Sequence, residues 1–365
     1  MRITDLKIRV VQPDDWTFTW NKDLPPISMT MTVFELETDE GITGYSTSWL
    51  PASPTEIAEA ADTFIKPVLL GRDIYDRERM WHEMLGMARF LVVPKAASNV
   101  DFALWDIAGK AAGLPIYKLL GAYRDSVPVY DTMQSQDTPE QMAELALASK
   151  NRGVTAVKLR AKPNAKTDIM GARLAREACG ADFVLMFDAT NGYDWEDAIK
   201  VGRALQGLDF FWYEDPMPDS DITGFRDLCA SLDIPVLMGE AIMRGPWQLG
   251  SILREGVADS IRGVGDLIGG ITGLRKIGAA AEMMSRRMEP HSYGSTLVQA
   301  AHLHYMLSVK NCTYFEMPYP RHGLDFGMKN VLEITDEGDV LAPSVPGIGY
   351  EIDWDIIDNS TIKRF

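Results

Sequence analysis

The sequence has few cysteines, and their arrangement marks neither a disulfide framework nor a metal cluster. Its 365 residues contain three, at Cys179, Cys229 and Cys312, far apart and without a Cys-x-x-Cys motif. An odd number of scattered cysteines is typical of reduced, buried thiols in an intracellular protein. We therefore expect a cytoplasmic protein.

Long apolar runs and basic clusters are also missing. No apolar stretch reaches the roughly 18 residues that suggest a membrane-spanning helix. Residues 1–8 alternate like a strand and lack the apolar core of a signal peptide. The formal net charge of −16, with no basic run, argues against nucleic-acid binding. We therefore expect a small-molecule substrate as the partner, neither a membrane nor a nucleic acid. The net charge does not exclude an anionic substrate, because a local cationic pocket can hold one.

The composition is that of a globular protein, and the length suits a barrel with a smaller domain. The N-terminal part reads as strands followed by helices, which predicts an α+β capping domain over residues 1–125. Its expected strands are 1–11, 28–38 and 42–47, and its expected helices are 54–69, 74–90 and 95–112. Two segments with aromatic residues, 14–21 and 46–51, are candidate lids over a site.

From residue 127 the pattern becomes a regular alternation of strands and helices. Strands are expected near 127–131, 154–160, 183–188, 208–214, 235–240, 258–262, 287–291 and 312–316. Eight strands joined by helical crossovers predict an α/β fold, a closed TIM-type (β/α)7β barrel over residues 126–334. Residues 335–365 have no room in the barrel and are expected to pack back on the capping domain.

Three short apolar runs each end in a carboxylate, at Asp188, Glu214 and Glu240. Each of these positions is 26 residues further along the chain than the one before. One βα unit takes about that many, since eight units fill roughly 250 residues. The spacing places the three side chains at the C-terminal ends of consecutive strands, the face that carries active sites in such barrels. Three converging anionic oxygens need a hard cation, and Mg²⁺ fits best because it keeps positions open for a substrate. Three unrelated helix caps would not account for a strand-end position that recurs three times.

Neighbouring strand ends supply candidate acids and bases. Lys158 and Arg160 lie at i and i+2 on the second strand, so their side chains point the same way. His291 ends the seventh strand and Glu316 the eighth. The second and seventh strands lie on opposite sides of the metal strands, so Lys158 and His291 are expected to flank a ligand. The other histidines are expected to be structural or exposed.

These residues resemble the enolase superfamily in its mandelate racemase subgroup, the mandelate racemase/muconate lactonizing enzyme family. The likeness covers nearly the whole chain and includes the metal-binding strand ends, the strand-seven histidine, Gly269-Gly270-Ile271-Thr272-Gly273 and Pro346-Gly347-Ile348-Gly349-Tyr350. It implies abstraction of a proton alpha to a carboxylate, an enediolate stabilised by Mg²⁺, and a homo-oligomer. Stabilisation is needed because the alpha proton of a carboxylate is far too weakly acidic for a side-chain base alone.

The chain departs from the family pattern in three places. After strand three, Thr190 replaces the asparagine that usually lies two residues after the first metal ligand, although Asn191 follows. On strand two, Arg160 replaces the usual second lysine; arginine stays protonated, so it is a poor base and a good fork for a carboxylate. On strand six, Val264 replaces the aspartate that usually pairs with the histidine. Asp266, two residues later, is the candidate substitute. Leu267 stands near the position where amino-acid epimerases of this type carry a lysine, which argues against a two-lysine racemase.

The leading hypothesis is a Mg²⁺-dependent lyase that dehydrates a sugar acid, an aldonate or aldarate, to a 2-keto-3-deoxy acid. His291 would act as the single base, Lys158 and Arg160 would hold the carboxylate, and Glu316 would hydrogen-bond the intermediate. One alternative is an isomerase of the same chemistry, either a racemase or epimerase using Lys158 and His291 or a lactone cycloisomerase. The alternative from another class is a barrel that binds metal and ligand without turnover.

Overall fold

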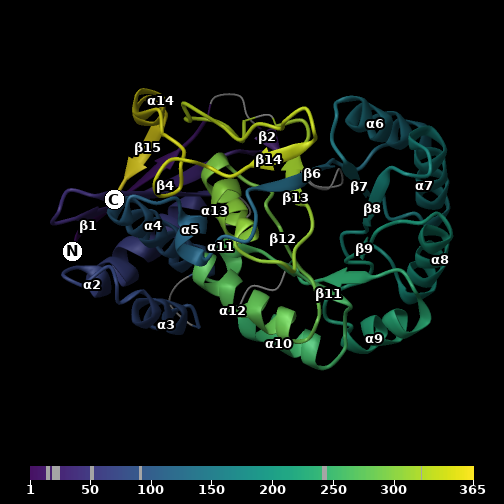
Figure 1. The fold of residues 1–365 in the computed structure, drawn as a ribbon, viewed down its shortest axis with the longest axis horizontal. Helices are drawn as coiled ribbons and strands as arrows, with labels where there is room; N and C mark the ends of the chain where they lie inside the picture. Colours follow the sequence, from purple (N-terminus) through teal and green to yellow (C-terminus); the bar gives the residue numbers. More distant parts are fainter. Residues whose placement is uncertain (14–16, 19–24, 50–52, 90–92, 241–244, 322) are drawn as a thin grey trace.

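The computed structural model describes residues 1–13, 17–18, 25–49, 53–89, 93–240, 245–321 and 323–365. Figure 1 shows a barrel beside a smaller N-terminal domain, with both chain termini on the smaller domain. Within the described ranges, no helix has both the length and the apolar character needed to cross a membrane.

The N-terminal domain is built on an antiparallel sheet with the strand order β15-β1-β4-β5. Its strands are β1 (Ile3–Val11), β4 (Met31–Thr38), β5 (Thr43–Trp49) and the C-terminal β15 (Thr361–Arg364); β2 (Thr17–Phe18) and β3 (Ile27–Ser28) pair separately. Its helices are α1 (Pro54–Ala60), the π-helical η1 (Ala61–Ile65), α2 (Lys66–Leu69), α3 (Arg77–Met87), α4 (Pro94–Ala112) and α5 (Ile116–Leu120). The predicted order of strands and helices is therefore present. Of the candidate lids, residues 14–16, 19–21 and 50–51 lie outside the described residues, and 46–49 belong to β5.

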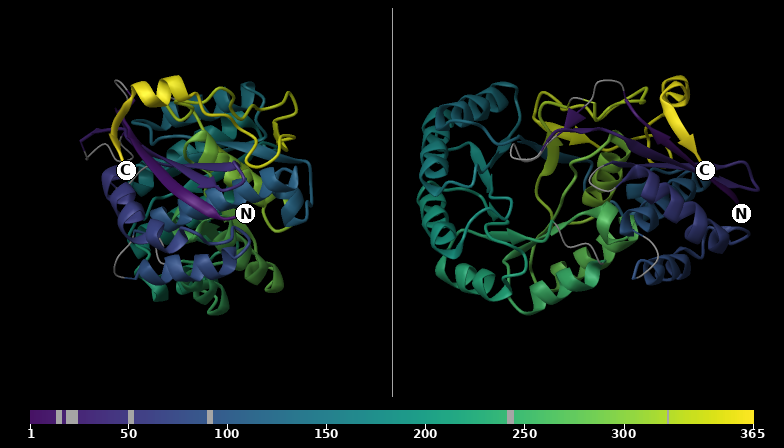
Figure 2. Two further views of the ribbon diagram at one scale, coloured as in Figure 1. Left: turned by 90° about the vertical axis from the view of Figure 1, so that its left-hand side faces the viewer. Right: turned by 180° about the vertical axis from the view of Figure 1, so that it is seen from behind.

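The larger part is the predicted (β/α)7β barrel, and the predicted fold class is confirmed. Its eight parallel strands are β6 (Ser126–Thr132), β7 (Ala156–Arg160), β8 (Val184–Asp188), β9 (Tyr213–Glu214), β10 (Val236–Met238), β11 (Ser260–Gly263), β12 (Met288–Pro290) and β13 (Phe315–Pro318). The crossovers contain α6 (Pro139–Asn151), α7 (Ala165–Cys179), α8 (Trp195–Gly207), α9 (Ile222–Ser231), α10 (Pro246–Arg254), α11 (Gly265–Ile268) with α12 (Gly270–Met283), and α13 (Thr296–Leu307). The helices lie outside the strands (Figure 2). The sheet runs from β12 round to β13, and the described strands show no ladder between those two.

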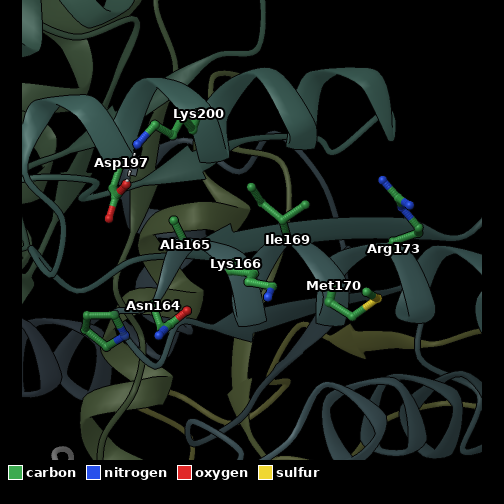
Figure 3. A pocket seen from close by; sticks show the side chains of 9 residues that line it. Asn164, Ala165, Lys166, Ile169, Met170, Arg173, Asp197 and Lys200 are labelled. Carbon is green, nitrogen blue, oxygen red and sulfur yellow. Dashed lines mark hydrogen bonds and ion pairs between the residues drawn. The ribbon is translucent and has the colours of Figure 1, made fainter.

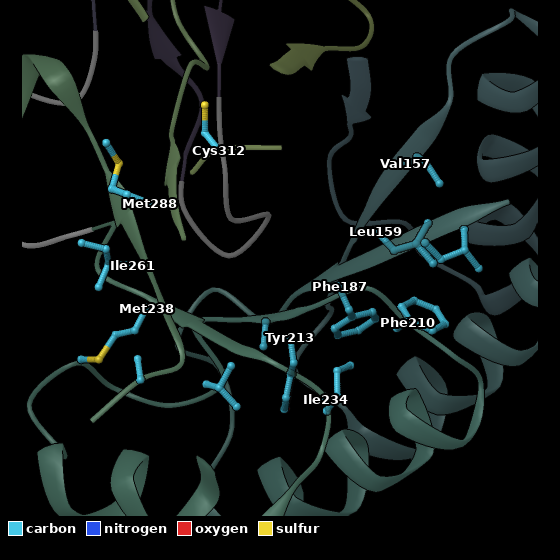
Figure 4. Close-up of a cluster of buried hydrophobic side chains, with 14 of the residues drawn as sticks. Val157, Leu159, Phe187, Phe210, Tyr213, Ile234, Met238, Ile261, Met288 and Cys312 are labelled. Atoms are coloured by element: carbon cyan, nitrogen blue, oxygen red, sulfur yellow. The ribbon is translucent and has the colours of Figure 1, made fainter. Parts of the chain in front are cut away.

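Alternation along the strands divides the barrel side chains into two sets. Outward side chains such as Leu159, Phe187 and Tyr213 pack against the helices in one large apolar cluster (Figure 4). The inward side chains of the lower layer form a second, small cluster of Tyr130, Ala156, Met186, Trp212 and Leu237. Because side chains alternate with a period of two, the next inward positions lie one layer nearer the C-terminal ends of the strands. Those positions carry the charged residues of the candidate site.

The Gly-Gly-Ile-Thr-Gly segment joins the barrel to the N-terminal domain. The backbone N–H of Gly269 donates to Ser98 Oγ at 3.0 Å, and Trp81 Nε1 donates to the Gly269 carbonyl at 2.7 Å. Gly269 has φ of 95°, and a Cβ there would lie 2.6 Å from Trp81 Nε1, so the position requires glycine. The Asp101 carboxylate accepts from the N–H of Thr272 at 2.9 Å and so caps the first turn of α12.

The C-terminal segment contacts both parts of the molecule. Strand β14 (Asp339–Leu341) pairs with β6 of the barrel, whereas β15 pairs with β1 of the N-terminal sheet. Helix α14 (Trp354–Asn359) lies between them in the sequence. All three cysteines are free; Cys179 and Cys312 are buried, but Cys229 is only half-buried, contrary to the expectation that all three are buried.

His304 on α13 links the barrel to both neighbouring segments. Its Nδ1 accepts a hydrogen bond from the N–H of Tyr117 at 3.2 Å, so Nε2 carries the proton and donates to the Ile348 carbonyl at 3.1 Å. The neighbouring His302 is buried as well, with Nε2 accepting from the N–H of Gly265. Burial lowers the pKa of each imidazole to about 4, so both are neutral at pH 7 and structural, as predicted.

We expect His304 to make the fold less stable in mild acid. An unfolded histidine takes up its proton near pH 6.5, whereas the folded His304 resists protonation down to about pH 4. Its contribution is therefore complete above pH 6.5 and lost as the pH falls towards 4, by about 3 kcal/mol. His304→Gln, whose amide can make both hydrogen bonds without titrating, should remove that part of the pH dependence in denaturant unfolding at pH 7.5 and 5. His82→Gln, at an exposed position on α3, is the control for removing a histidine elsewhere in the chain.

Candidate active site

The three predicted metal ligands converge at the C-terminal ends of β8, β9 and β10. One carboxylate oxygen from each of Asp188, Glu214 and Glu240 lies within 4.8 Å of the other two. Asp188 and Glu214 are inward residues of regular strands and are fully buried. Glu240 follows Gly239, whose φ of 120° redirects the chain after β10, and its side chain is 32% exposed. The 26-residue spacing thus brings three acids from neighbouring strands to one place.

The donor set of this triad fits a hard divalent cation. All three side chains offer carboxylate oxygens, the ligands that Mg²⁺ prefers. Asp188 Oδ2 is buried and makes ion pairs but no hydrogen bond, while Oδ1 accepts from the N–H of Thr190 at 2.8 Å. Burial raises the pKa of Glu214 and of Glu240, and the nearby carboxylate of Asp188 raises both further. A bound cation would favour the ionised form of all three.

Lys158 and Arg160 both point into the acidic cluster, as their i and i+2 spacing on β7 predicts. Lys158 Nζ lies 3.0 Å from Glu214 Oε2 and 3.4 Å from Asp188 Oδ2, and Arg160 Nη2 lies 3.3 Å from the same Asp188 oxygen. Burial and Arg262 would lower the pKa of Lys158, but the surrounding carboxylates outweigh them and hold it well above its ordinary value. Lys158 is therefore a fixed cation here, as is Arg160.

His291 and Glu316 complete the site from β12 and β13. His291 Nε2 lies 3.4 Å from Glu240 Oε1 and 3.9 Å from Glu316 Oε2, and its Nδ1 is buried without a hydrogen-bond partner. Burial lowers the pKa of His291 to about 4, with Glu316 opposing and the nearby cations adding to the effect. Glu316 Oε1 lies 3.0 Å from Lys158 Nζ. Burial would raise the pKa of Glu316, but Arg262 and Lys158 hold it well below its usual range.

Arg262 on β11 is a member of the site that the sequence analysis missed. Its side chain is fully buried, with Nε 2.9 Å from Glu214 Oε1 and Nη2 2.7 Å from Glu316 Oε2. Nη2 also donates to the hydroxyl of Tyr130 at 2.7 Å. The signal was in the sequence, because an arginine at an inward position of a barrel strand must find buried acidic partners.

Asp266 does not take the place of the missing aspartate beside His291. Its Oδ2 lies 2.9 Å from the Nζ of Lys95, which projects from the start of α4 in the N-terminal domain. Both side chains are buried, so the ion pair is shielded from solvent. Val264, at the usual aspartate position, is buried and apolar. Asp266 therefore does not pair with His291.

A hollow on the outer surface, between α7 and α8, is separate from this cluster. Figure 3 shows Lys166, Ile169, Met170 and Arg173 on one side and Lys200 with Asp197 on the other. None of the candidate site residues lines it.

Comparison with protein families matches two regions that together cover most of the chain. Residues 141–356 match the family described as "Enolase C-terminal domain-like". Residues 22–121 match "Mandelate racemase / muconate lactonizing enzyme, N-terminal domain".

Similar curated proteins act on sugar acids. L-talarate/galactarate dehydratase of Salmonella typhimurium is 32% identical over 289 residues, which is 77% of this chain and 71% of that protein. Arabinonate dehydratase of Saccharolobus solfataricus is 30% identical over 342 residues, 91% of this chain and 90% of that protein. The relatives also include D-galactarolactone cycloisomerase of Agrobacterium fabrum, 29% identical over 88% of this chain and 89% of that protein.

Solved structures show the same architecture. D-glucarate dehydratase from Agrobacterium tumefaciens, crystallised with magnesium, is 30% identical and has a TM-score of 0.89, with 100% of both chains covered.

We expect Mg²⁺ to stabilise the protein through the triad. An ion that binds only the folded state at about 100 times its Kd adds about 2.7 kcal/mol, so Mg²⁺ should raise the thermal midpoint and EDTA should reverse the rise. Glu240→Gln should remove most of the rise, because it replaces an anionic ligand by a neutral one. Glu255→Gln, on the exposed side of the barrel, should keep it. A wild-type midpoint that does not respond to saturating Mg²⁺ would contradict the metal site.

Proposed function

The chain belongs to the mandelate racemase/muconate lactonizing enzyme family of the enolase superfamily, and from that premise we propose that it is a Mg²⁺-dependent sugar-acid dehydratase. The reaction would remove the proton alpha to the carboxylate and expel the beta hydroxyl. An aldonate or aldarate would thereby give a 2-keto-3-deoxy acid. The observation that carries the proposal is that only one neutral base, His291, faces the acidic cluster among the described residues.

The substrate carboxylate would bind between the triad and the cations of β7. Mg²⁺ held by Asp188, Glu214 and Glu240 would supply electrostatic stabilisation of the negative charge that develops on the carboxylate oxygens. Arg160 presents a planar fork suited to a carboxylate, and Lys158 a compact charge. These two cations would orient the carboxylate and place its alpha carbon towards the opposite side of the barrel.

His291 is the residue in a state to remove the alpha proton. A general base must be unprotonated, and burial keeps the pKa of His291 at about 4, so the imidazole is neutral at pH 7. The acids around Lys158 hold its pKa well above its ordinary value, which favours carboxylate binding over a role as second base. Abstraction from one face alone favours elimination over racemisation.

The same imidazole can complete the elimination. After it takes the alpha proton, the electron pair of the broken C–H bond forms the new double bond as the C–O bond to the beta hydroxyl breaks. The imidazolium then protonates the departing hydroxide, which leaves as water and returns His291 to its neutral form. The enol product becomes the 2-keto-3-deoxy acid by proton transfer from water.

A lactone cycloisomerase is the second candidate, and the similarity to D-galactarolactone cycloisomerase favours it. The two activities would share the alpha-proton chemistry and differ in the group that leaves the beta carbon, which is a free hydroxyl in the dehydratase and the ring oxygen in the lactone cycloisomerase. A panel of sugar acids and their lactones at saturating Mg²⁺, monitored for 2-keto product and for lactone isomers, distinguishes them. Absence of turnover with the whole panel would favour a binding protein. We also propose a homo-oligomer, by likeness to the family, which light scattering would test.

Replacement of the base should abolish proton removal. His291→Asn is expected to lower kcat by about 10²–10⁴-fold, the usual range for a general base, and to stop exchange of the alpha hydrogen with D₂O. Lys158→Met should retain some exchange, because it impairs carboxylate binding and leaves the base in place. NMR of the substrate in D₂O measures both.

The outcome that favours an isomerase is equally specific. If Lys158→Met abolishes exchange from one epimer while His291→Asn abolishes it from the other, two opposed bases are present. The dehydratase proposal would then be wrong.

A further inference from the structure

Arg262 is a buried cation whose partners lie on four other strands of the barrel. Its guanidinium contacts Glu214 on β9 at 2.9 Å, Glu316 on β13 at 2.7 Å and the Tyr130 hydroxyl on β6 at 2.7 Å. Nη1 also donates to the carbonyl of Pro290 on β12 at 3.3 Å. One side chain thus spans the barrel interior beneath the acidic cluster. It also joins β12 to β13, the two strands that show no ladder in the described part of the sheet.

The position of Arg262 relative to the metal ligands gives it an electrostatic role. The cluster contains four acidic groups, on Asp188, Glu214, Glu240 and Glu316, and three permanent cations, Lys158, Arg160 and Arg262. A buried carboxylate without a compensating charge is costly, so the cations let the acids stay together before a metal binds. The same charges repel an incoming divalent cation.

We propose that Arg262 is a built-in counter-cation of the metal site. It neutralises Glu214 and Glu316, which keeps the acidic cluster assembled without metal, and it competes with the divalent cation for Glu214, which weakens metal binding. Arg262 is therefore a positioning residue that acts through two carboxylates. This inference rests on the proposed Mg²⁺ site.

Removal of the Arg262 charge should have two opposite effects, which removal of a merely structural arginine would not have. Loss of the positive charge should make the metal-free protein less stable, because buried acids lose their partner. It should also make Mg²⁺ bind more tightly, because a competing cation is gone. A structural arginine, by contrast, would lower stability and leave metal affinity unchanged or weaker.

The experiment compares metal affinity and metal-free stability in matched variants. Arg262→Gln keeps an amide that can hydrogen-bond the same partners but removes the charge, whereas Arg262→Lys keeps the charge and loses the fork. Arg176→Gln is the control, because Arg176 binds the carbonyls of Leu208 and Phe183 outside the strands and is remote from the cluster. The Kd for Mg²⁺ is measured by titration calorimetry at pH 8, where the carboxyl groups are more fully ionised, and thermal midpoints are measured in EDTA.

We expect Arg262→Gln to lower the thermal midpoint in EDTA and to bind Mg²⁺ about tenfold more tightly, since one unit charge at such short range is worth at least that at an effective dielectric of about 20. Arg262→Lys and Arg176→Gln should bind Mg²⁺ like the wild type. Unchanged or weaker binding by a folded Arg262→Gln would overturn the proposal. Failure of the wild type itself to bind Mg²⁺ would instead refute the proposed metal site.

A second variant keeps the test decisive if Arg262→Gln does not fold. Glu316→Gln removes one of the two acids that share Arg262 and leaves its charge opposed mainly by Glu214. Mg²⁺ binding should then weaken about tenfold, by the same electrostatic argument. Wild-type affinity in Glu316→Gln would contradict the proposal.

Discussion

The charge balance inside the barrel is the constraint on which the rest of the site depends. Acids and cations from six strands are buried together, where an unpaired charge would be far costlier than in water. The fully buried ones are therefore held by partners of opposite sign, as Glu214 is by Lys158 and Arg262. The layer beneath them is apolar; in it the rings of Trp212 and Tyr130 meet edge to face, with their centroids 5.6 Å apart. The site is thus a charged layer on an apolar one, at the C-terminal ends of the strands.

The same balance separates the residues by protonation state. Lys158 lies among carboxylates that keep it charged, whereas His291 lies close to cations and in a buried setting that keep it neutral. A fixed cation suits carboxylate binding, and a neutral imidazole suits proton removal. The two roles therefore follow from the burial and the charges around each side chain; Glu316 lies near both, 3.0 Å from Lys158 Nζ and 3.9 Å from His291 Nε2. An ionised Glu316 accepts hydrogen bonds, so it would act on the substrate by orienting Lys158 and His291.

The sequence predicted the parts of this site that depend on local periodicity. The equal spacing of Asp188, Glu214 and Glu240 reflects the length of a βα unit, and the pairing of Lys158 with Arg160 reflects strand alternation. Arg262 was missed because its role depends on partners 54 and 132 residues away in the sequence, at Glu316 and Tyr130. Those contacts form because the barrel brings distant strands together, and a local sequence pattern does not show which residues then meet. The order of the helices and strands was predictable for the same reason that the spacing was, but their limits were not: the strand expected at 208–214 is only Tyr213–Glu214.

Asp266 shows what the sequence could not resolve. Its proximity to the strand-six end made it a candidate partner for His291, but the choice depended on what the N-terminal domain brings to that place. Lys95 supplies a buried cation there, and the adjoining Gly269 turn is held by Trp81 and other side chains of the same domain. The loop after β11 is therefore fixed from the N-terminal domain. Because the backbone N–H of His291 donates to the Gly263 carbonyl at the end of β11, that attachment extends to the candidate base itself. The N-terminal domain thus helps to set the geometry of the barrel site through its contacts with strand six.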